Sequence, residues 1–195
     1  GIICTHGDLL SFQISNINNF DIEEGIKDFD FTSGANEIKE EYNKYKKGEL
    51  QKGIKLGIKK LDKFLGGIYP GELCVVIGKT GGYKSTFLCS SALNAYLEGN
   101  NVLFFTIEMS YLQVLKRFYS SIFSISVNKL EDLEINNEEI KKMEEGIKNY
   151  SKRENKLIII DCMQGLTPEI LSTKINEYKR KLGKIDIVMV DYLQI

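Results

Sequence analysis

Short apolar runs alternate with helical patterns over most of the chain. Four runs have the length and composition of buried strands; they lie at 73–77, 102–107, 157–161 and 186–190. Between and after them, apolar residues recur at spacings of three and four. This pattern predicts helices at 85–97, 111–123, 137–150 and 168–182. Strands that alternate with helices indicate a mainly parallel sheet flanked by helices on both faces.

The first part of the chain lacks this regularity. Residues 1–36 are rich in Asn, Asp, Ser and Gly and keep no sustained apolar period, which predicts an irregular arm or linker. Residues 37–47 predict a helix, with acidic residues at its start and lysines at its end. Its apolar residues Ile38, Tyr42 and Tyr45 share one face. The helix is either solvated or docks on a neighbouring subunit.

The composition fits one ordinary α/β core with an appended arm. Hydrophobic residues make up 43% and charged residues 27% of the 195 residues, and the formal net charge is −1. This charge argues against a polyanion-binding chain as a whole, although a local or oligomeric nucleic-acid site stays open. We divide the chain into an arm at 1–36, a linker helix at 37–52 and an α/β core at 53–195.

Other features narrow the class of protein. No apolar run is long enough to span a bilayer, so we expect no membrane and a cytoplasmic location, which includes a host cytoplasm or an organelle matrix. The four cysteines have no CxxC spacing and the chain has one histidine, which argues against a zinc site and favours reduced, structural thiols.

The segment that joins the first predicted strand to the first core helix carries the strongest chemical pattern. It reads Gly-Lys-Thr-Gly-Gly-Tyr-Lys-Ser at 78–85, close to the phosphate-loop pattern GxxxxGK[ST]. In such a loop, backbone N–H groups and the positive end of the following helix face phosphate oxygens. Lys84 would reach the β- and γ-phosphates, and the Ser85 hydroxyl would ligate Mg²⁺. The predicted nucleotide-binding residues are Gly78, Lys79, Thr80, Gly81, Gly82, Tyr83, Lys84, Ser85 and Thr86.

Residue 83 departs from this pattern, which has glycine immediately before the lysine. Glycine suits that place because backbone and phosphate approach closely, whereas Tyr83 adds a Cβ and a large ring. Three outcomes are open: the ring points outward and leaves the loop intact, nucleotide binding weakens, or the site is inactive. Because Gly81 and Gly82 keep the loop adaptable, we favour a functional loop.

Three carboxylates follow or end predicted strands. Glu108 lies at the end of the run at 102–107, where a parallel strand faces the ligand crevice and a carboxylate can orient a water for attack on the γ-phosphate. The alternative is a capping or surface glutamate. Asp191 ends the run at 187–190, the pattern of an acid that holds Mg²⁺. Asp161 we interpret as structural, lining the crevice or capping a loop. In this order, the loop, Glu108 and Asp191 are stronger evidence together than separately.

Around these residues the sequence resembles the replicative hexameric DNA helicases of the DnaB-like family. The most specific segment is Val-Asp-Tyr-Leu-Gln at 190–194, which is similar to the family's Walker-B signature. Segments at 56–62 and 66–73 look like the stretch ahead of the phosphate loop, and 105–110 is similar to the segment that carries the catalytic glutamate. The resemblance runs from about residue 37 to the end of the chain.

The resemblance implies a RecA-like P-loop NTPase core that hydrolyses ATP with Mg²⁺, translocates on single-stranded DNA and unwinds duplex. It implies a homo-oligomeric ring, a hexamer, with a primase or a loader as a possible partner. By position it makes Glu108 and Lys84 catalytic residues, with Glu108 as the base that activates water. It makes Ser85 and Asp191 the metal-binding residues.

The resemblance also implies segments beyond Ile195. In the family these supply DNA-binding loops, an arginine finger and a strand between the phosphate-loop strand and the Walker-B strand. We therefore expect the parent protein to continue and these residues alone to be inactive as a helicase. Two other functions stay open: a RecA/RadA- or KaiC-like ATPase, and a degenerate helicase-like scaffold or loader subunit, which Tyr83 motivates.

Overall fold

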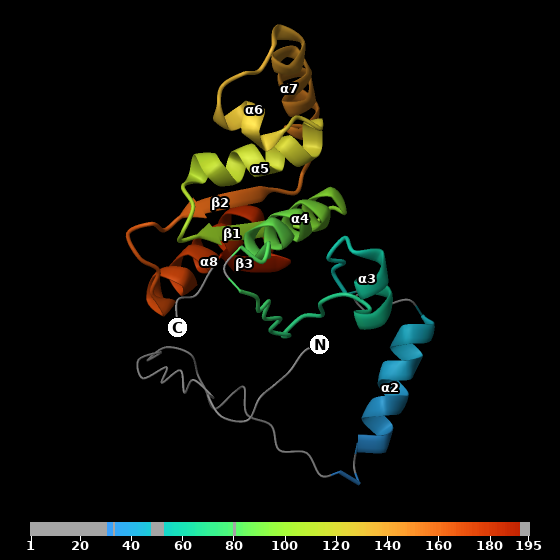
Figure 1. Cartoon of the computed structure of the whole chain (residues 1–195). Coiled ribbons are helices and arrows are strands. Elements are labelled where there is room, and N and C mark those ends of the chain that lie inside the picture. Colours follow the sequence, from blue (N-terminus) through green and yellow to red (C-terminus); the bar gives the residue numbers. More distant parts are fainter. Residues whose placement is uncertain (1–30, 33, 48–52, 80, 192–195) are drawn as a thin grey trace. The chain divides into compact units, whose positions relative to one another are not determined.

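The computed structural model describes residues 31–32, 34–47, 53–79 and 81–191 (Figure 1). Most of the predicted arm, at 1–30, lies outside the described residues. The chain divides into two compact units, Gly1–Leu50 and Gln51–Ile195. In the first unit, helix α2 spans Gly34–Lys46, so the helix predicted at 37–47 is confirmed with an earlier start. Its apolar side chains Ile38 and Tyr42 are 69% and 55% exposed.

A parallel sheet of three strands forms the centre of the second unit. Strand β1 (Val102–Thr106) lies between β2 (Leu157–Asp161) and β3 (Ile187–Asp191), and both neighbours run parallel to it. Three of the four predicted strands are thereby confirmed. The central strand is buried along its whole length, as its unbroken apolar run predicts.

Helices cover both faces of the sheet. Helices α4 (Lys84–Leu97) and α5 (Tyr111–Phe123) lie on one face and α8 (Pro168–Leu182) on the other (Figure 1). Successive residues of β1 point to opposite faces, so Phe104 packs with α4 and α5 while Phe105 packs with residues of α8. The mainly parallel, helix-flanked fold that the sequence predicts is confirmed.

Three further helices complete the described part. Helix α7 (Asn137–Tyr150) is confirmed, and a capping box at Asn136 fixes its start. Helices α3 (Lys59–Leu65) and α6 (Val127–Glu131) are not in the sequence prediction, because five to seven residues are too few to show a helical period. No helix in the described residues is long and apolar enough to cross a membrane.

The prediction of a buried strand at 73–77 is wrong for this structure. The segment has no strand pairing, and Leu73 and Ile77 are 89% and 84% exposed. An apolar run shows that burial is favourable, but a strand also needs a neighbour that satisfies its backbone N–H and C=O groups. In the described residues, the segment has no such neighbour and β3 pairs only with β1. The additional strand implied by the resemblance stays a prediction.

A tight loop ahead of this segment explains two of the sequence motifs. The buried Asp62 carboxylate accepts hydrogen bonds from the backbone of Leu56 (2.7 Å) and Gly57 (3.0 Å), so one acid folds the 56–62 segment on itself. The backbone at Gly67 approaches Gly53 so closely that a Cβ on Gly67 would lie 2.5 Å from the carbonyl carbon of Gly53. These motifs are therefore requirements of the fold.

The burial of Phe104 predicts a large loss of stability on truncation. Phe104 is fully buried, and its ring meets that of Phe118 edge to face at 5.7 Å. We expect Phe104→Ala to lower the free energy of unfolding by about 3–5 kcal/mol, measured by urea denaturation. The matched control is Phe64→Ala, because Phe64 is 85% exposed, and this variant should change stability by less than about 0.5 kcal/mol. Equal losses in both variants would contradict the core assignment.

Candidate functional site

The carboxyl ends of the three strands bring the predicted acidic residues to one edge of the sheet. Thr106, the last residue of β1, lies in register between Asp161 and Asp191. Helix α4 starts at the same edge, because the Ser85 hydroxyl donates a hydrogen bond to Asp191 Oδ1 at 3.1 Å. Residues 106 positions apart in the sequence thus meet, and they are the two predicted metal-binding residues.

The loop at 78–83 curls around the lysine that follows it. Lys84 Nζ donates to the carbonyl oxygens of Gly78 (2.9 Å) and Lys79 (3.1 Å), and Gly82 N donates to Lys79 O (2.9 Å). A Cβ on Gly82 would lie 2.8 Å from Lys79 O, so this position requires glycine. Gly81 has φ 75°, in the left-handed region. In the described residues, the glycines therefore permit a backbone whose carbonyl oxygens at 78 and 79 bind the lysine ammonium.

Tyr83 stands directly before α4 with its ring in solvent. Its backbone has φ 60° and ψ 22°, the left-handed region that favours glycine, and its side chain is 79% exposed. The sequence left three outcomes open for Tyr83, and in the structure its ring points outward. The exposed ring does not fill the loop. Thr80 lies outside the described residues.

Asp191 is the most constrained carboxylate of the site. It is 1% exposed, and its Oδ2 atom is buried without a hydrogen-bond partner among the described residues. Burial raises the pKa of Asp191, the nearby charge of Glu108 raises it further, and the hydrogen bond from Ser85 opposes the shift. A buried carboxylate oxygen without a donor is costly, and a cation beside it would remove the cost.

The oxygen set suits a magnesium ion that a nucleotide brings with it. Mg²⁺ usually takes one or two protein ligands and completes its shell with waters and phosphate oxygens, and Ser85 and Asp191 offer that number of oxygens here. Within the described ranges, no three His, Cys, Asp or Glu side chains gather in a metal-binding group. The thiols of Cys74, Cys89 and Cys162 are free, and burial raises the pKa of Cys89 to about 12, so that thiol is a poor metal ligand.

Glu108 lies in the short turn between β1 and α5. Its side chain is exposed, and its charge reaches Asp191. Of the two alternatives, a helix cap does not apply, because Ser110 caps α5 through a capping box with Gln113. An exposed surface glutamate agrees with the geometry, and the catalytic role stays a prediction. Glu108 is thus a solvent-accessible carboxylate at the strand end beside the loop.

Comparison with known proteins identifies the fold and the family. Residues 53–195 match the family described as DnaB-like helicase C terminal domain. The chain belongs to this family. It is 30% identical over 146 residues to the replicative DNA helicase DnaB of Buchnera aphidicola subsp. Schizaphis graminum, a match that covers 73% of this chain and 30% of the relative. With the Mycoplasma genitalium DnaB it shares 29% identity over 172 residues, which covers 86% of this chain and 36% of the relative. The chain thus spans about a third of the length of these relatives.

Two solved structures share the fold. One is a DnaB-like replicative helicase, described together with its interactions with primase; it has a TM-score of 0.69 and 22% identity over 85% of this chain and 39% of its own. The other is an ATPase domain with a TM-score of 0.62 and 23% identity over 86% of this chain and 58% of its own. The RecA-like fold inferred from the sequence is confirmed.

Arg117 has no role in the sequence prediction, although it lies in the segment similar to the DnaB-like family. Its Nη1 atom donates to Thr86 Oγ1 at 3.3 Å, from α5 to α4, and its positive charge opposes the rise in the pKa of Asp191 that burial causes. From the sequence, a basic residue at this point of a helix is expected on a solvated face, and only the packing of α5 on α4 shows that Arg117 reaches the first turn of α4.

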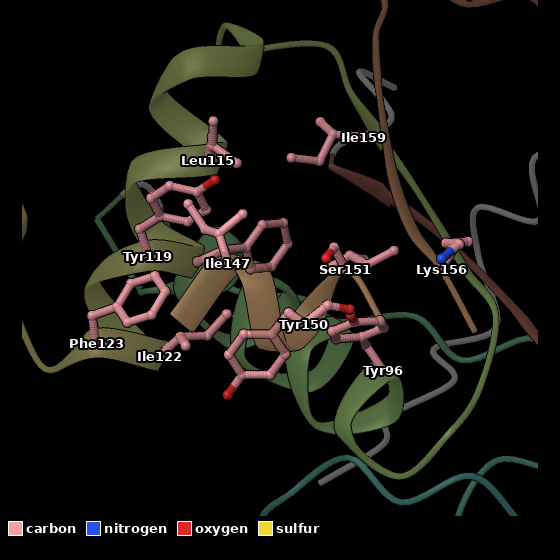
Figure 2. Close-up of a pocket in the computed structure, with 12 residues that line it drawn as sticks. Tyr96, Leu115, Tyr119, Ile122, Phe123, Ile147, Tyr150, Ser151, Lys156 and Ile159 are labelled. Atoms are coloured by element: carbon pink, nitrogen blue, oxygen red, sulfur yellow. The ribbon is translucent and has the colours of Figure 1, made fainter. Parts of the chain in front are cut away.

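An apolar pocket of this DnaB-like domain lies away from the predicted site. It has a volume of about 260 Å³ between α5, α7 and β2, and Figure 2 shows Tyr119, Phe123, Ile147 and Tyr150 around it. None of the predicted site residues lines it. The candidate nucleotide site is instead an open edge, formed by the loop and the strand ends.

The strained backbone at residue 83 predicts a small gain in stability on substitution. Left-handed backbone destabilises the folded state by about 1–2 kcal/mol at a non-glycine residue. Glycine avoids this strain, but it loses more conformational entropy on folding, which cancels about 0.5–1 kcal/mol of the gain. We expect Tyr83→Gly to raise the free energy of unfolding by up to about 1 kcal/mol in urea denaturation. Leu133, with φ 60° and 75% exposure far along the chain, is the matched control, and Leu133→Gly should give a similar gain. A clear loss in Tyr83→Gly alone would show that the ring stabilises the loop.

Proposed function

We propose that this chain is the ATP-binding and hydrolysing motor core of a replicative DNA helicase, which moves along single-stranded DNA and unwinds duplex. The observation that carries the proposal is the 3.1 Å contact between Ser85 Oγ and Asp191 Oδ1. It joins the serine of a phosphate loop to the acid of a strand end, the two groups that would share Mg²⁺ in a P-loop ATPase. The family assignment supports the same function, since its members are named as helicases.

In this proposal the loop recognises phosphate through its backbone and through Lys84. The ammonium of Lys84 now rests on the carbonyl oxygens of Gly78 and Lys79, and it would exchange these for β- and γ-phosphate oxygens. The N-terminus of α4 adds the N–H groups of Ser85 and Thr86, which have no partner within the helix. Mg²⁺ bound beside Ser85 and Asp191 would neutralise charge on the phosphates.

Glu108 is the proposed general base. It is exposed, it stands past the end of β1, and its charge reaches Asp191. A carboxylate in this place can accept a hydrogen bond from a water and orient it toward the γ-phosphate. The base therefore follows the strand that lies between the two strands that carry Asp161 and Asp191.

We also propose a homo-oligomeric ring, a hexamer, that acts on single-stranded DNA, has a primase or a loader as its partner and is located in the cytoplasm. Support for subunit contacts comes from α2, whose exposed Ile38 and Tyr42 offer an apolar surface. Support for a primase comes from the helicase of similar fold, which is described with its interactions with primase.

A scaffold without catalysis is the second candidate, and Tyr83 is the observation that motivates it. The outward ring and the closed turn around Lys84 weaken that motive, because neither removes the phosphate-binding groups. Turnover of the full-length protein beside Tyr83→Gly separates the two candidates. Wild-type turnover close to that of the variant supports the motor, whereas activity confined to the variant supports the scaffold.

Lys84 and Glu108 should affect ATP use differently. We expect Lys84→Ala to weaken both ATP binding and turnover, because the ammonium contacts phosphate in the ground state and in the transition state. Glu108→Gln should keep the dissociation constant for ATP within about 3-fold and lower kcat by about 10²–10⁴-fold, since it removes only the base. ATP affinity and phosphate release measure the two effects.

The control for Glu108→Gln is Glu144→Gln, because Glu144 is an exposed residue of α7 outside the proposed site. It should retain wild-type kcat. Full turnover in Lys84→Ala would contradict the proposed site.

Single-stranded DNA should stimulate ATP turnover by the full-length protein, if the motor moves along it. The stimulation should fall as salt is raised, because contacts to DNA phosphates release counterions. Phosphate release with and without an oligonucleotide, at two salt concentrations, measures this. If ATP turnover depends on Glu108 but does not change when DNA is added, the protein is an ATPase and the proposal of a helicase motor is refuted.

A further inference from the structure

The position of Glu108 depends on the backbone that carries it. The side chain is exposed, so packing does not fix it. It stands in a turn at 107–110, between the end of β1 and the start of α5. A base must hold its water within hydrogen-bond reach, and small displacements cost large factors in rate. The groups that hold this turn therefore bear on catalysis.

The turn is tied to the strands on both sides of β1. On the β3 side, Ile107 N donates to Asp191 O at 2.8 Å. Within the turn, Thr106 Oγ1 donates to Met109 O at 2.6 Å. On the β2 side, the backbone N–H of Tyr111, the first residue of α5, donates to Asp161 Oδ2 at 2.9 Å.

Asp161 is itself held in one orientation. Its second oxygen, Oδ1, accepts from Met163 N at 3.1 Å, so each carboxylate oxygen takes a backbone N–H. The N–H of Tyr111 lies in the first turn of α5, where no partner exists within the helix, and a negative charge is favourable at that end. The bond from Asp161 is therefore charge-assisted and joins β2 to the end of the turn that carries Glu108.

We propose that Asp161 is a positioning residue for Glu108. Through Tyr111 N it holds the start of α5 against β2, and so sets where the turn presents the Glu108 carboxylate relative to the loop. This rests on the proposed function for the role of Glu108. It gives Asp161 a part in hydrolysis and none in nucleotide binding, because its hydrogen bonds in the described residues go to Tyr111 and Met163 and not to the loop.

The first test compares Asp161→Ala with Asp161→Asn. Asp161→Ala should lower kcat by about 10–100-fold and leave the dissociation constant for ATP within about 2-fold, the same split as Glu108→Gln. Asp161→Asn keeps one acceptor oxygen and should recover part of the rate. Asp132→Ala is the control, because Asp132 is an exposed aspartate at the end of α6, and it should retain wild-type kcat. Wild-type kcat in Asp161→Ala would overturn the inference.

The second test removes the donor instead of the acceptor. Tyr111→Pro deletes the N–H that Asp161 accepts, and proline is well tolerated at the first position of a helix. Ser110 already has φ −63° and ψ 155°, the conformation that a following proline requires. Tyr111→Pro should lower kcat as Asp161→Ala does, and the double variant should be no slower than either. Tyr111→Ala keeps the N–H and should retain the rate. Additive losses would overturn the inference.

Amide exchange separates this inference from the proposed function. In Asp161→Ala, the N–H of Tyr111 should lose protection against hydrogen exchange by at least about 10-fold, while amides of β1 stay protected. This measurement reports the hydrogen bond between Tyr111 and Asp161 and does not require catalytic activity. If the wild type lacks turnover but the exchange result holds, the proposed function fails and the anchoring of the turn stands. If protection is unchanged, the positioning role of Asp161 is refuted whatever the turnover.

Discussion

The parallel pairing of β1 with both of its neighbours is the constraint on which the site depends. Its register puts Thr106 between Asp161 and Asp191, so three strand ends separated by tens of residues in the sequence meet at one edge. Parallel strands need long crossover connections, and here those connections are the helices that bury the sheet. The loop, the acid and the turn that carries Glu108 are assembled by that single arrangement. Change the register, and the contact between Ser85 and Asp191 is lost.

The same edge concentrates features that cost stability. Asp191 is buried with one oxygen without a donor in the described residues, a second carboxylate acts on it, and Tyr83 occupies left-handed backbone. Each of these is unfavourable in the isolated fold, and in the proposed function each would favour the binding of a cation and phosphates. The positive charge of Lys84, whose ammonium donates to the carbonyl oxygens of Gly78 and Lys79, offsets part of the rise in the pKa of Asp191 that burial causes. The buried sheet thus stabilises the fold, and this stability compensates for the unfavourable groups at its edge.

In the turn after β1, hydrogen bonds to the backbone position Glu108, whose own side chain is exposed. Ser110 and Gln113 satisfy two N–H groups at the start of α5 by a capping box, and Asp161 accepts from the N–H of Tyr111, one of those that the box leaves. The sequence interpretation of Asp161 as a structural cap agrees with this geometry. Such a structural residue is also in a position to influence chemistry, because the backbone it fixes is the one that presents Glu108.

The sequence by itself determined the strands β1, β2 and β3, the long helices, and the order of loop, Glu108 and Asp191. These follow from local periodicity and from spacing, which are properties of neighbouring residues. Short helices such as α6 escaped because five residues show no period. Only the tertiary structure decided the rest: that 73–77 does not pair, that Tyr83 points outward, that Arg117 meets Thr86, and that Asp161 holds α5. The ring of Tyr83 follows its left-handed backbone, and the other three features depend on whether a partner far along the chain is present, which a pattern of apolar and polar residues does not say.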